Sequence, residues 1–276
     1  MISINEYINR FKYNPFIDND MIIEGLNIDE KNKLVKLTSE HNKGVDFDID
    51  KLIHYKVNNI NVYSIFKRTK LKTEQGFERD GNPFIYALKE INGWKFDISD
   101  QDIINYCRKF LNQCEKIDKQ YDTIIIVPSG SNLNERFMKT LSGIIKSKYN
   151  IKDFFIKVTK EDAYDSRNLT KIKNDSKTNK EYEDILDEID DGFKQMKGKW
   201  FEAKHINKKY LKYIECIISN NNNYELFDCL EYIMNKNILV LDDTISSGET
   251  ISKCVKAIQS YDPNKVDVIT LLSKIK

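Results

Sequence analysis

Four short apolar runs dominate the pattern of hydrophobic and polar positions beyond residue 120. Each is rich in β-branched or aliphatic residues, as expected for strands covered on both faces of a parallel sheet. We expect all four to join one sheet, with the FFIKV run nearer its edge. They are TIIIV (123–127), FFIKV (154–158), ILVL (238–241) and VDVITLL (266–272).

Helical periodicity fills much of the sequence between these runs. Segments 134–148 and 249–261 place apolar residues at i, i+3, i+4 and i+7, so strands alternate with helices and the pattern predicts an α/β layer. The interval 159–236 breaks this alternation. It opens with KEDAYDSRNLTKIKNDSKTNKEYED, which we interpret as a mobile loop, and continues with helical pieces at 183–196 and 207–219.

The first 120 residues carry a different pattern, in which apolar runs are separated by turn signals. An Asp-Gly pair and an Asn-Gly pair, both favoured in hairpins, separate predicted strands. The predicted elements in this region are strands at 61–69, 83–91 and 94–98 and a helix at 100–117. We therefore predict an antiparallel α+β accessory region at 1–120 and an open parallel α/β core at 121–276, with the long loop and helical insertion at 159–236.

Composition and charge mainly exclude classes of protein. A formal net charge of +1 gives no general attraction to nucleic acid or acidic membranes, and no apolar run approaches the roughly 18 residues that cross a bilayer. The five cysteines form no CxxC pair, and the three histidines are far apart. We expect a cytoplasmic protein without a zinc site, a membrane partner or a nucleic-acid partner.

The stretch ILVLDDTISSGETI contains the chemistry on which the functional prediction depends. Its TISSG loop offers backbone N–H groups, serine hydroxyls and a glycine before a helix N-terminus, which together favour phosphate binding. Asp242 and Asp243 would repel a phosphate that they faced. We therefore expect them to accept hydrogen bonds from hydroxyl groups or to contact a cation. A sugar phosphate meets both requirements.

This stretch resembles the phosphoribosyl pyrophosphate (PRPP) motif of the type I phosphoribosyltransferases, in which four hydrophobic residues precede an acidic pair and a Thr/Ser-and-Gly loop. The resemblance implies that Asp242 and Asp243 contact the ribose 2′- and 3′-hydroxyls. Mg²⁺ would enter mainly with PRPP, with water-mediated contact to the acidic pair as one option and no separate metal site. Glu249 departs from the motif, and its carboxylate must point outward. The resemblance assigns the 5′-phosphate to Thr244, Ile245, Ser246, Ser247, Gly248, Glu249 and Thr250.

A second loop, PSGSN at 128–132, follows the first core strand and resembles the loop that holds pyrophosphate in this family. Because the first and third core strands are neighbours in such a fold, we expect both loops to open on one cleft. The polar stretch after residue 158 would supply a closing loop. The predicted pyrophosphate residues are Ser129, Gly130, Ser131 and Asn132, and the candidate cations, among which the sequence does not choose, are Arg136, Lys157, Lys160, Lys171 and Lys173.

The acidic motif has three other interpretations. A buried strand that ends in an Asp-Asp turn with a serine cap is a purely structural alternative. The haloacid-dehalogenase motif requires Asp-x-Asp-x-Thr, which DDTIS does not supply, and the Gly-Lys-Ser/Thr of a Walker loop is absent. The resemblance covers roughly 122–158 and 237–272, less than half of the chain.

The sequence thus predicts a phosphoribosyltransferase that binds Mg²⁺-PRPP, transfers the phosphoribosyl group to a small acceptor, most favourably a nucleobase, and releases pyrophosphate. The alternative is a catalytically inactive PRPP-binding regulatory or partner-binding protein. A third interpretation is transfer onto a base of a nucleic acid or protein, or use of a related activated sugar. A homodimer is compatible with each. Acceptor recognition would come from 1–120 or the insertion, with candidate stacking residues Tyr63, Phe66, Phe84, Tyr86 and Trp94.

Overall fold

The computed structural model describes twelve segments of the chain. They are 25–38, 45–46, 53–57, 59–68, 72–73, 76–77, 82–96, 121–145, 147–215, 218–220, 226–245 and 248–273. The helix expected at 100–117, the Asp-Gly turn, and two of the loop serines, Ser246 and Ser247, lie outside these residues.

Strands dominate the first part of the chain, and helices become more frequent after residue 120. The first part holds β1 (Gly25–Asp29), β2 (Leu34–Thr38), β3 (Val45–Asp46), β4 (Ile53–Val57), β5 (Ile60–Arg68), β6 (Lys72–Thr73), β7 (Gly76–Phe77), α2 (Asn82–Lys89) and β8 (Lys95–Phe96). There follow β9 (Thr123–Ile126), α4 (Leu133–Ile145), β10 (Tyr149–Ile151), β11 (Phe155–Lys157), α5 (Lys160–Asp165), α6 (Leu169–Asp175) and α7 (Asn179–Gln195). The remainder holds the 3₁₀ helices η1 (Ala203–His205) and η2 (Lys208–Tyr213), then β12 (Ile218–Asn220), α8 (Leu226–Tyr232), β13 (Asn237–Ile245), α9 (Glu249–Gln259) and β14 (Lys265–Ser273).

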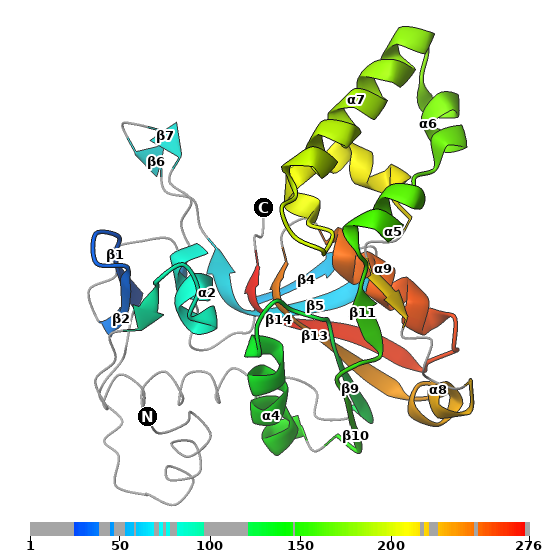
Figure 1. Ribbon diagram of the computed structural model, residues 1–276. Helices are drawn as coiled ribbons and strands as arrows, with labels where there is room; N and C mark the ends of the chain where they lie inside the picture. The colour runs from blue at the N-terminus through cyan, green and yellow to red at the C-terminus, as the bar shows by residue number, and fades with distance from the viewer. Residues whose placement is uncertain are drawn as a thin grey trace, which may run out of the picture.

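The centre of the molecule is a mixed, mostly parallel sheet (Figure 1). Within the described residues it has seven strands in the order β10-β9-β13-β14-β5-β3, with β4 also paired to β5. The first five of these strands run parallel to one another, whereas β3 and β4 are antiparallel to β5. This arrangement confirms the predicted α/β class.

Both faces of the sheet are covered by helices, which explains why its strands are nearly continuous apolar runs. Along β13, Leu239 and Leu241 pack into a buried cluster with α2 and α4. The alternate residues Ile238 and Val240 pack on the other face with α8 and α9. The side-chain alternation of a strand therefore distributes this one run between two cores.

The strand expected at 61–69 forms as β5, but its place differs from the prediction. It pairs in parallel with β14, so Val62 lies opposite Val268 within the main sheet and not in an antiparallel accessory region. Val62 is fully buried beside Val268 in one cluster, and Tyr63 packs against the cluster on the other face. Burial on two faces favours a place inside the large sheet over a place in a small one.

The strand predicted at 83–91 is wrong, because this segment forms helix α2. Its buried residues Phe84, Ile85, Ala87 and Leu88 have helical spacing and share one cluster with α4. Pro83 stands in the first turn, where its missing N–H costs nothing. The expected hairpin at 92–98 is also wrong, since β8 pairs in parallel with β2 in a small sheet with β1.

The FFIKV run is not a strand of the main sheet, which corrects a further expectation. β11 pairs antiparallel with β12 in a separate two-stranded sheet, whereas the strand beside β9 is β10. Only Ile151 of the three residues in β10 is buried. Such a short and polar edge strand gives no apolar run that the sequence pattern could reveal.

The polar stretch after residue 158 is helical, so the mobile loop predicted there is wrong. It forms α5, α6 and the first turns of α7, and each helix begins at a side chain that accepts a backbone N–H three residues ahead. These caps are Thr159, Asn168 and Thr178, and such caps typically stabilise a helix by about 1 kcal/mol.

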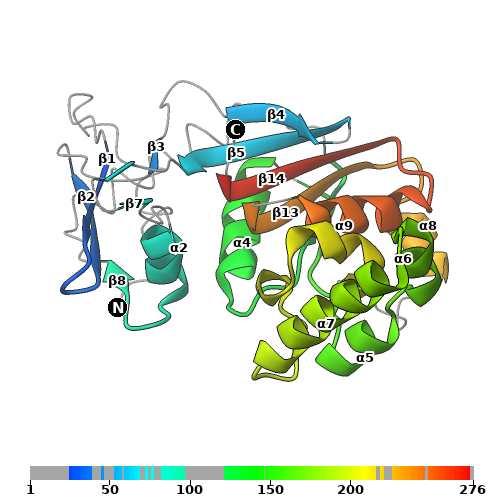
Figure 2. The ribbon, with the colours of Figure 1, turned by 90° about the horizontal axis from the view of Figure 1, so that it is seen from above.

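The insertion has a hydrophobic core of its own. Ile172, Ile189 and Phe193 are buried together with Leu211 and Ile214, apart from the two clusters that flank the sheet. Figures 1 and 2 show this unit at one side of the molecule and α2 with β1 and β2 at the other. Each helix that the structure describes is too short or too polar to cross a lipid bilayer.

Replacing Gly192 by alanine should destabilise the insertion. A Cβ at this position of α7 would lie 2.5 Å from the His205 carbonyl oxygen and 2.6 Å from Cδ1 of Ile206. Overpacking of this kind costs about 1–3 kcal/mol. Gly198→Ala is the matched control, because a Cβ there meets nothing within 4 Å. Urea denaturation followed by circular dichroism measures the loss. Equal stability of the two variants would contradict the close packing of α7 on the His205 turn.

Candidate functional site

The carboxyl ends of β9 and β13 lie side by side. The two strands are parallel neighbours, with Leu241 opposite Ile126, and the Val127 N–H donates to the Leu241 carbonyl at 2.8 Å. The loop 128–132 therefore begins next to the acidic pair. In open parallel sheets, this edge between two neighbouring strands is where ligands commonly bind.

The acidic pair lies within a strand and not after one, which corrects the expected start of the loop. β13 continues to Ile245, because β14 is long enough to pair with Asp242 through Thr270 and with Thr244 through Leu272. Thr244 and Ile245 are thus strand residues. Of the loop expected at 244–250, only the part after Ile245 connects β13 to α9.

Asp243 is a buried carboxylate with three side-chain partners. Its residue is only 5% exposed. It accepts hydrogen bonds from the Ser129 hydroxyl at 2.9 Å and the Thr244 hydroxyl at 3.0 Å, and its Oδ2 lies 2.5 Å from Nζ of Lys89. A buried carboxylate is costly unless it is paired in this way. Ser129 and Asp243, two residues predicted to belong to different loops, are therefore in direct contact.

Asp242 is held in a different protonation state from an ordinary aspartate. Burial, together with the charge of the adjacent Asp243, raises the pKa of Asp242 to about 8. The Asp243 N–H, which donates to Oδ1 of Asp242 at 2.8 Å, and the charge of Lys89 oppose this shift. At neutral pH Asp242 is therefore mostly protonated, because its charged form is disfavoured beside another acid.

Of the four candidate lysines, Lys157 is the one that approaches the first loop. Its Nζ lies 3.7 Å from where a Cβ of Gly130 would stand. Burial and the positive charge of Lys89 lower the pKa of Lys157, against the attraction of Asp243 and Glu202. Lys160 and Lys171 instead donate to carbonyl groups of the insertion, and Lys173 is exposed on α6.

The loop 128–132 leads into helix α4, and its residues cap the helix. The Ser131 hydroxyl accepts the Leu133 N–H at 3.3 Å, and the Asn132 carbonyl accepts the Arg136 N–H at 3.0 Å. Gly130 is exposed. The Arg136 guanidinium donates to the Leu88 carbonyl at 3.2 Å, so it ties α4 to α2.

Asn134, in the first turn of α4, is a site residue that the sequence did not single out. It is fully buried, and its amide nitrogen donates to the Val127 carbonyl at 2.8 Å. Its Oδ1 has no hydrogen-bond partner. A buried amide oxygen without a partner is unusual. The Asn134 side chain also lies close enough to Asp242 for a hydrogen bond that opposes the rise in the pKa of that residue.

Gly248 begins helix α9 with a positive φ of 79°, as the motif led us to expect. A Cβ there would lie 3.2 Å from Cγ1 of Val57, so the residue is constrained both by its backbone and by β4. Glu249 and Thr250 form the first turn of the helix and are partly exposed.

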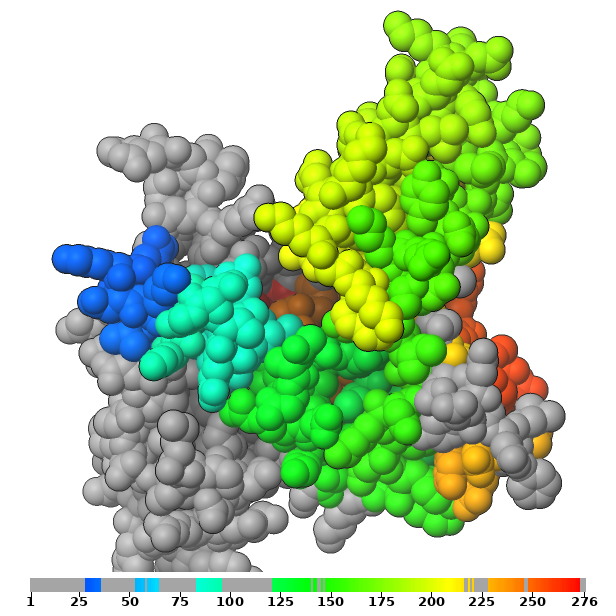
Figure 3. Space-filling view, viewed as in Figure 1, coloured from blue at the N-terminus to red at the C-terminus, as the bar shows by residue number. Residues whose placement is uncertain are grey.

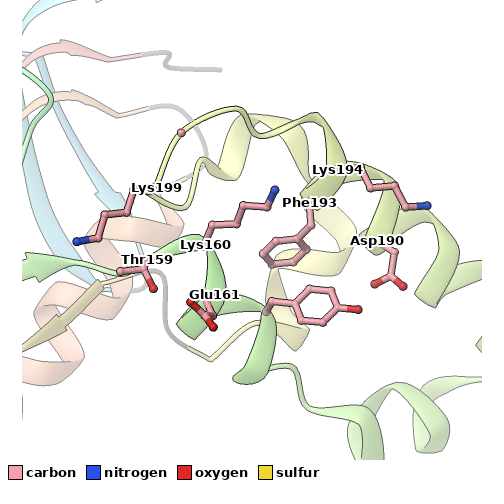
Figure 4. A pocket seen from close by; sticks show the side chains of 9 residues that line it. Thr159, Lys160, Glu161, Asp190, Phe193, Lys194 and Lys199 are labelled. Atoms are coloured by element: carbon pink, nitrogen blue, oxygen red, sulfur yellow. The ribbon is translucent and has the colours of Figure 1, made fainter.

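A cavity of about 510 Å³ lies in the insertion, away from the acidic pair (Figure 4). The rings of Tyr164 and Phe193 meet edge to face inside it, with centroids 5.1 Å apart. Of the residues predicted to bind the ligand, only Lys160, one of the candidate cations, lines it. The lining residues are Thr159, Lys160, Glu161, Tyr164, Asp190, Phe193, Lys194, Gly198 and Lys199.

Lys89 was not identified from the sequence as a site residue, because α2 was interpreted as a strand. In a strand, the Lys89 side chain would have had a different direction.

Figure 3 shows a hollow between α2, in cyan, and the insertion, in yellow-green, with orange and red atoms of the segment that holds β13 and β14 at its floor. Within the described residues, no three His, Cys, Asp or Glu side chains gather as a protein metal site would require. The polar groups at this edge of the sheet are the acids Asp242 and Asp243, the lysines Lys89 and Lys157, and the hydroxyls of Ser129 and Thr244.

The Asp242→Asn variant should be more stable than the wild type at pH 8. Because its pKa is raised, folded Asp242 keeps a proton that the unfolded chain releases above about pH 4, so stability is lost as the pH rises from 4 towards 8. Asparagine removes this loss, and we expect a gain of at least about 1.4 kcal/mol at pH 8, the equivalent of one pKa unit. The gain should vanish near pH 4.

Thermal and urea unfolding from pH 4 to 8 measures this difference. Asp262→Asn is the control, because that residue is an exposed aspartate in a left-handed turn that asparagine also adopts. An Asp242→Asn variant that is less stable at pH 8, or whose gain is the same at every pH, would contradict the raised pKa.

Comparison with known proteins does not assign the chain to a family. A scan against models of protein families finds none that matches, and a search of curated proteins finds no match either. What the site can do is therefore a question for its own residues.

Proposed function

We propose that this protein binds PRPP with Mg²⁺ and transfers the phosphoribosyl group to an acceptor, most favourably a nucleobase, with release of pyrophosphate. The observation that carries the proposal is the 2.9 Å hydrogen bond from Ser129 to Asp243. It joins two stretches of sequence that separately resemble the pyrophosphate loop and the PRPP motif of type I phosphoribosyltransferases. The strand order β10-β9-β13-β14, with the insertion between β10 and β13, supports a fold of that kind.

The sheet edge offers a suitable partner for each part of PRPP. The 5′-phosphate would bind after β13, where Gly248 has a positive φ and the N-terminus of α9 carries partial positive charge. The ribose hydroxyls would meet the acidic pair, of which Asp243 accepts hydrogen bonds and protonated Asp242 can also donate one. The pyrophosphate would lie at the loop 128–132, beside Lys157 and the N-terminus of α4.

The proposed reaction breaks the bond between the anomeric carbon and pyrophosphate and forms a bond from that carbon to an acceptor nitrogen. Negative charge develops on the departing pyrophosphate, and a fixed ammonium group such as Lys157 stabilises it. An anion at this position would also relieve the repulsion between Lys157 and Lys89, which after burial is the next cause of the lowered pKa of Lys157.

The residues present fit Mg²⁺ that arrives with its substrate. This ion usually keeps several waters and is held by one or two carboxylates together with phosphate oxygens. At neutral pH Asp243 supplies one such carboxylate, and Asp242 would supply a second if Mg²⁺ displaced its proton. When bound, Mg²⁺ would neutralise charge on the pyrophosphate, and the protein residues would position the ribose.

A PRPP-binding regulator is the second candidate, and one observation favours it. A loop that closes at every turnover is usually loosely held. In this protein the corresponding segment is a capped helical unit with its own buried core. Such a unit is better suited to bind a partner than to open and close quickly.

Replacing Lys157 by methionine should weaken PRPP binding at least tenfold, about 1.4 kcal/mol, because an ammonium group beside the pyrophosphate is lost. Binding of ribose 5-phosphate, which lacks that group, should not change. Lys173→Met is the control, since this lysine is exposed on α6. Isothermal titration calorimetry with Mg²⁺ measures both ligands. If the wild type binds neither, the proposed function is wrong.

A pyrophosphate-release screen over purine and pyrimidine bases separates the enzyme from the regulator. The transferase should release pyrophosphate with at least one base, and Lys157→Met should reduce the rate by about 10² or more, as loss of a group aimed at developing charge does. Binding of PRPP without release with any base would support the regulator instead.

A further inference from the structure

Lys89 is fixed in the site by a helix and not carried on a flexible arm. It is the last residue of α2, and its side chain is only 18% exposed. The preceding carbonyl, of Leu88, accepts a hydrogen bond from Arg136 of α4. Phe84 and Leu88 are buried in the cluster that α2 shares with α4. The helix therefore fixes the backbone from which the Lys89 side chain reaches Asp243.

The ammonium group of Lys89 competes with any ligand for Asp243. This carboxylate is buried, and its two oxygens already accept from Ser129, Thr244 and Lys89. Ser129 lies in the loop that follows β9, and Thr244 lies near the end of β13. Lys89 alone of these three donors comes from a separate element, so it is the donor that a ligand hydroxyl can displace.

Once displaced from Asp243, the ammonium group of Lys89 could pair with an anion at the loop 128–132. Lys157 stands near enough for the charge of Lys89 to lower its pKa, and Lys157 also approaches Gly130. Two ammonium groups thus flank the loop 128–132. An anion at this loop would pair with both and remove their mutual repulsion.

We propose that Lys89 exchanges partners when ligand binds: it neutralises Asp243 in the free protein and pairs with the pyrophosphate group of the bound ligand. This inference rests on the proposed function. The exchange leaves Asp243 free to accept the ribose hydroxyls. It also transmits occupancy of the site to α2, which contacts β2 and β8 of the small sheet.

The first test compares two ligands, PRPP and ribose 5-phosphate, by calorimetry with Mg²⁺. Lys89→Met should weaken PRPP binding at least tenfold, because the pyrophosphate loses a partner. The same variant should bind ribose 5-phosphate as well as or better than the wild type, because no ion pair has to be broken. Lys89→Arg should restore most of the PRPP affinity. Lys95→Met, an exposed lysine of β8, is the control and should change neither.

The second test uses tryptophan fluorescence. The chain has two tryptophans, Trp94 beyond α2 and Trp200 in the insertion, and Trp94 packs against the same cluster as α2. In a Trp200→Phe background, saturation with PRPP should therefore change the emission of Trp94, and ribose 5-phosphate should change it less. Lys89→Met should remove the difference between the ligands.

The outcomes separate the two proposals. A wild type that binds neither ligand overturns the proposed function and the exchange with it. A wild type that binds both, with equal weakening of both in Lys89→Met, overturns the exchange alone and leaves Lys89 as a structural ion pair. Should Lys89→Met not fold, the Trp200→Phe protein decides, because unchanged Trp94 emission at PRPP saturation overturns the exchange.

Discussion

A carboxylate buried at the end of a parallel strand has to be neutralised by its neighbours, and much of this molecule is arranged around that requirement at Asp243. Ser129 brings the loop after β9 to it, Thr244 fixes the end of β13, and Lys89 brings helix α2 over the edge of the sheet. Removal of one partner from a buried ion pair costs about 3–5 kcal/mol. One charge therefore links three segments that the sequence keeps far apart.

At the opposite end of the sheet, another buried carboxylate, Asp267, is neutralised by a different arrangement of neighbours. Asp267, near the start of β14, is 1% exposed and accepts hydrogen bonds from Tyr121 at 2.5 Å and Asn61 at 2.9 Å, with Nζ of Lys265 at 2.8 Å. Its partners come from its own strand, the neighbouring strand β5 and the residues before β9. Asp243 instead has a partner on a helix. The hydrogen bonds and the ion pair of Asp267 thus involve no helix, whereas those of Asp243 include Lys89 of α2.

The apolar pattern of the sequence predicted secondary structure correctly for strands that are buried on both faces. It did not do so for the run 83–91, which forms helix α2. The runs that became β9, β13 and β14 are covered on both faces, so their apolar pattern sufficed. The run 83–91 is longer and has charged residues near its end, and periodicity does not separate a buried helix of this length from a strand. In the site, the acidic motif and the glycine with positive φ could be predicted. Lys89 could not, because its position depends on α2. Lys157 could not be chosen, because its place depends on the pairing of β11 with β12.

The pairing of β5 with β14 has a consequence for synthesis of the chain. Asn61 and Asp267, joined by a hydrogen bond across these strands, are 206 residues apart. While the ribosome makes the intervening sequence, β5 can pair only with earlier strands such as β4, and its other edge has no partner. Contacts of such long sequence separation form slowly and leave strand edges open to aggregation. The central sheet can therefore be completed only after β14 has left the ribosome, and until then the nascent protein depends on its helices and on chaperones to keep that edge covered.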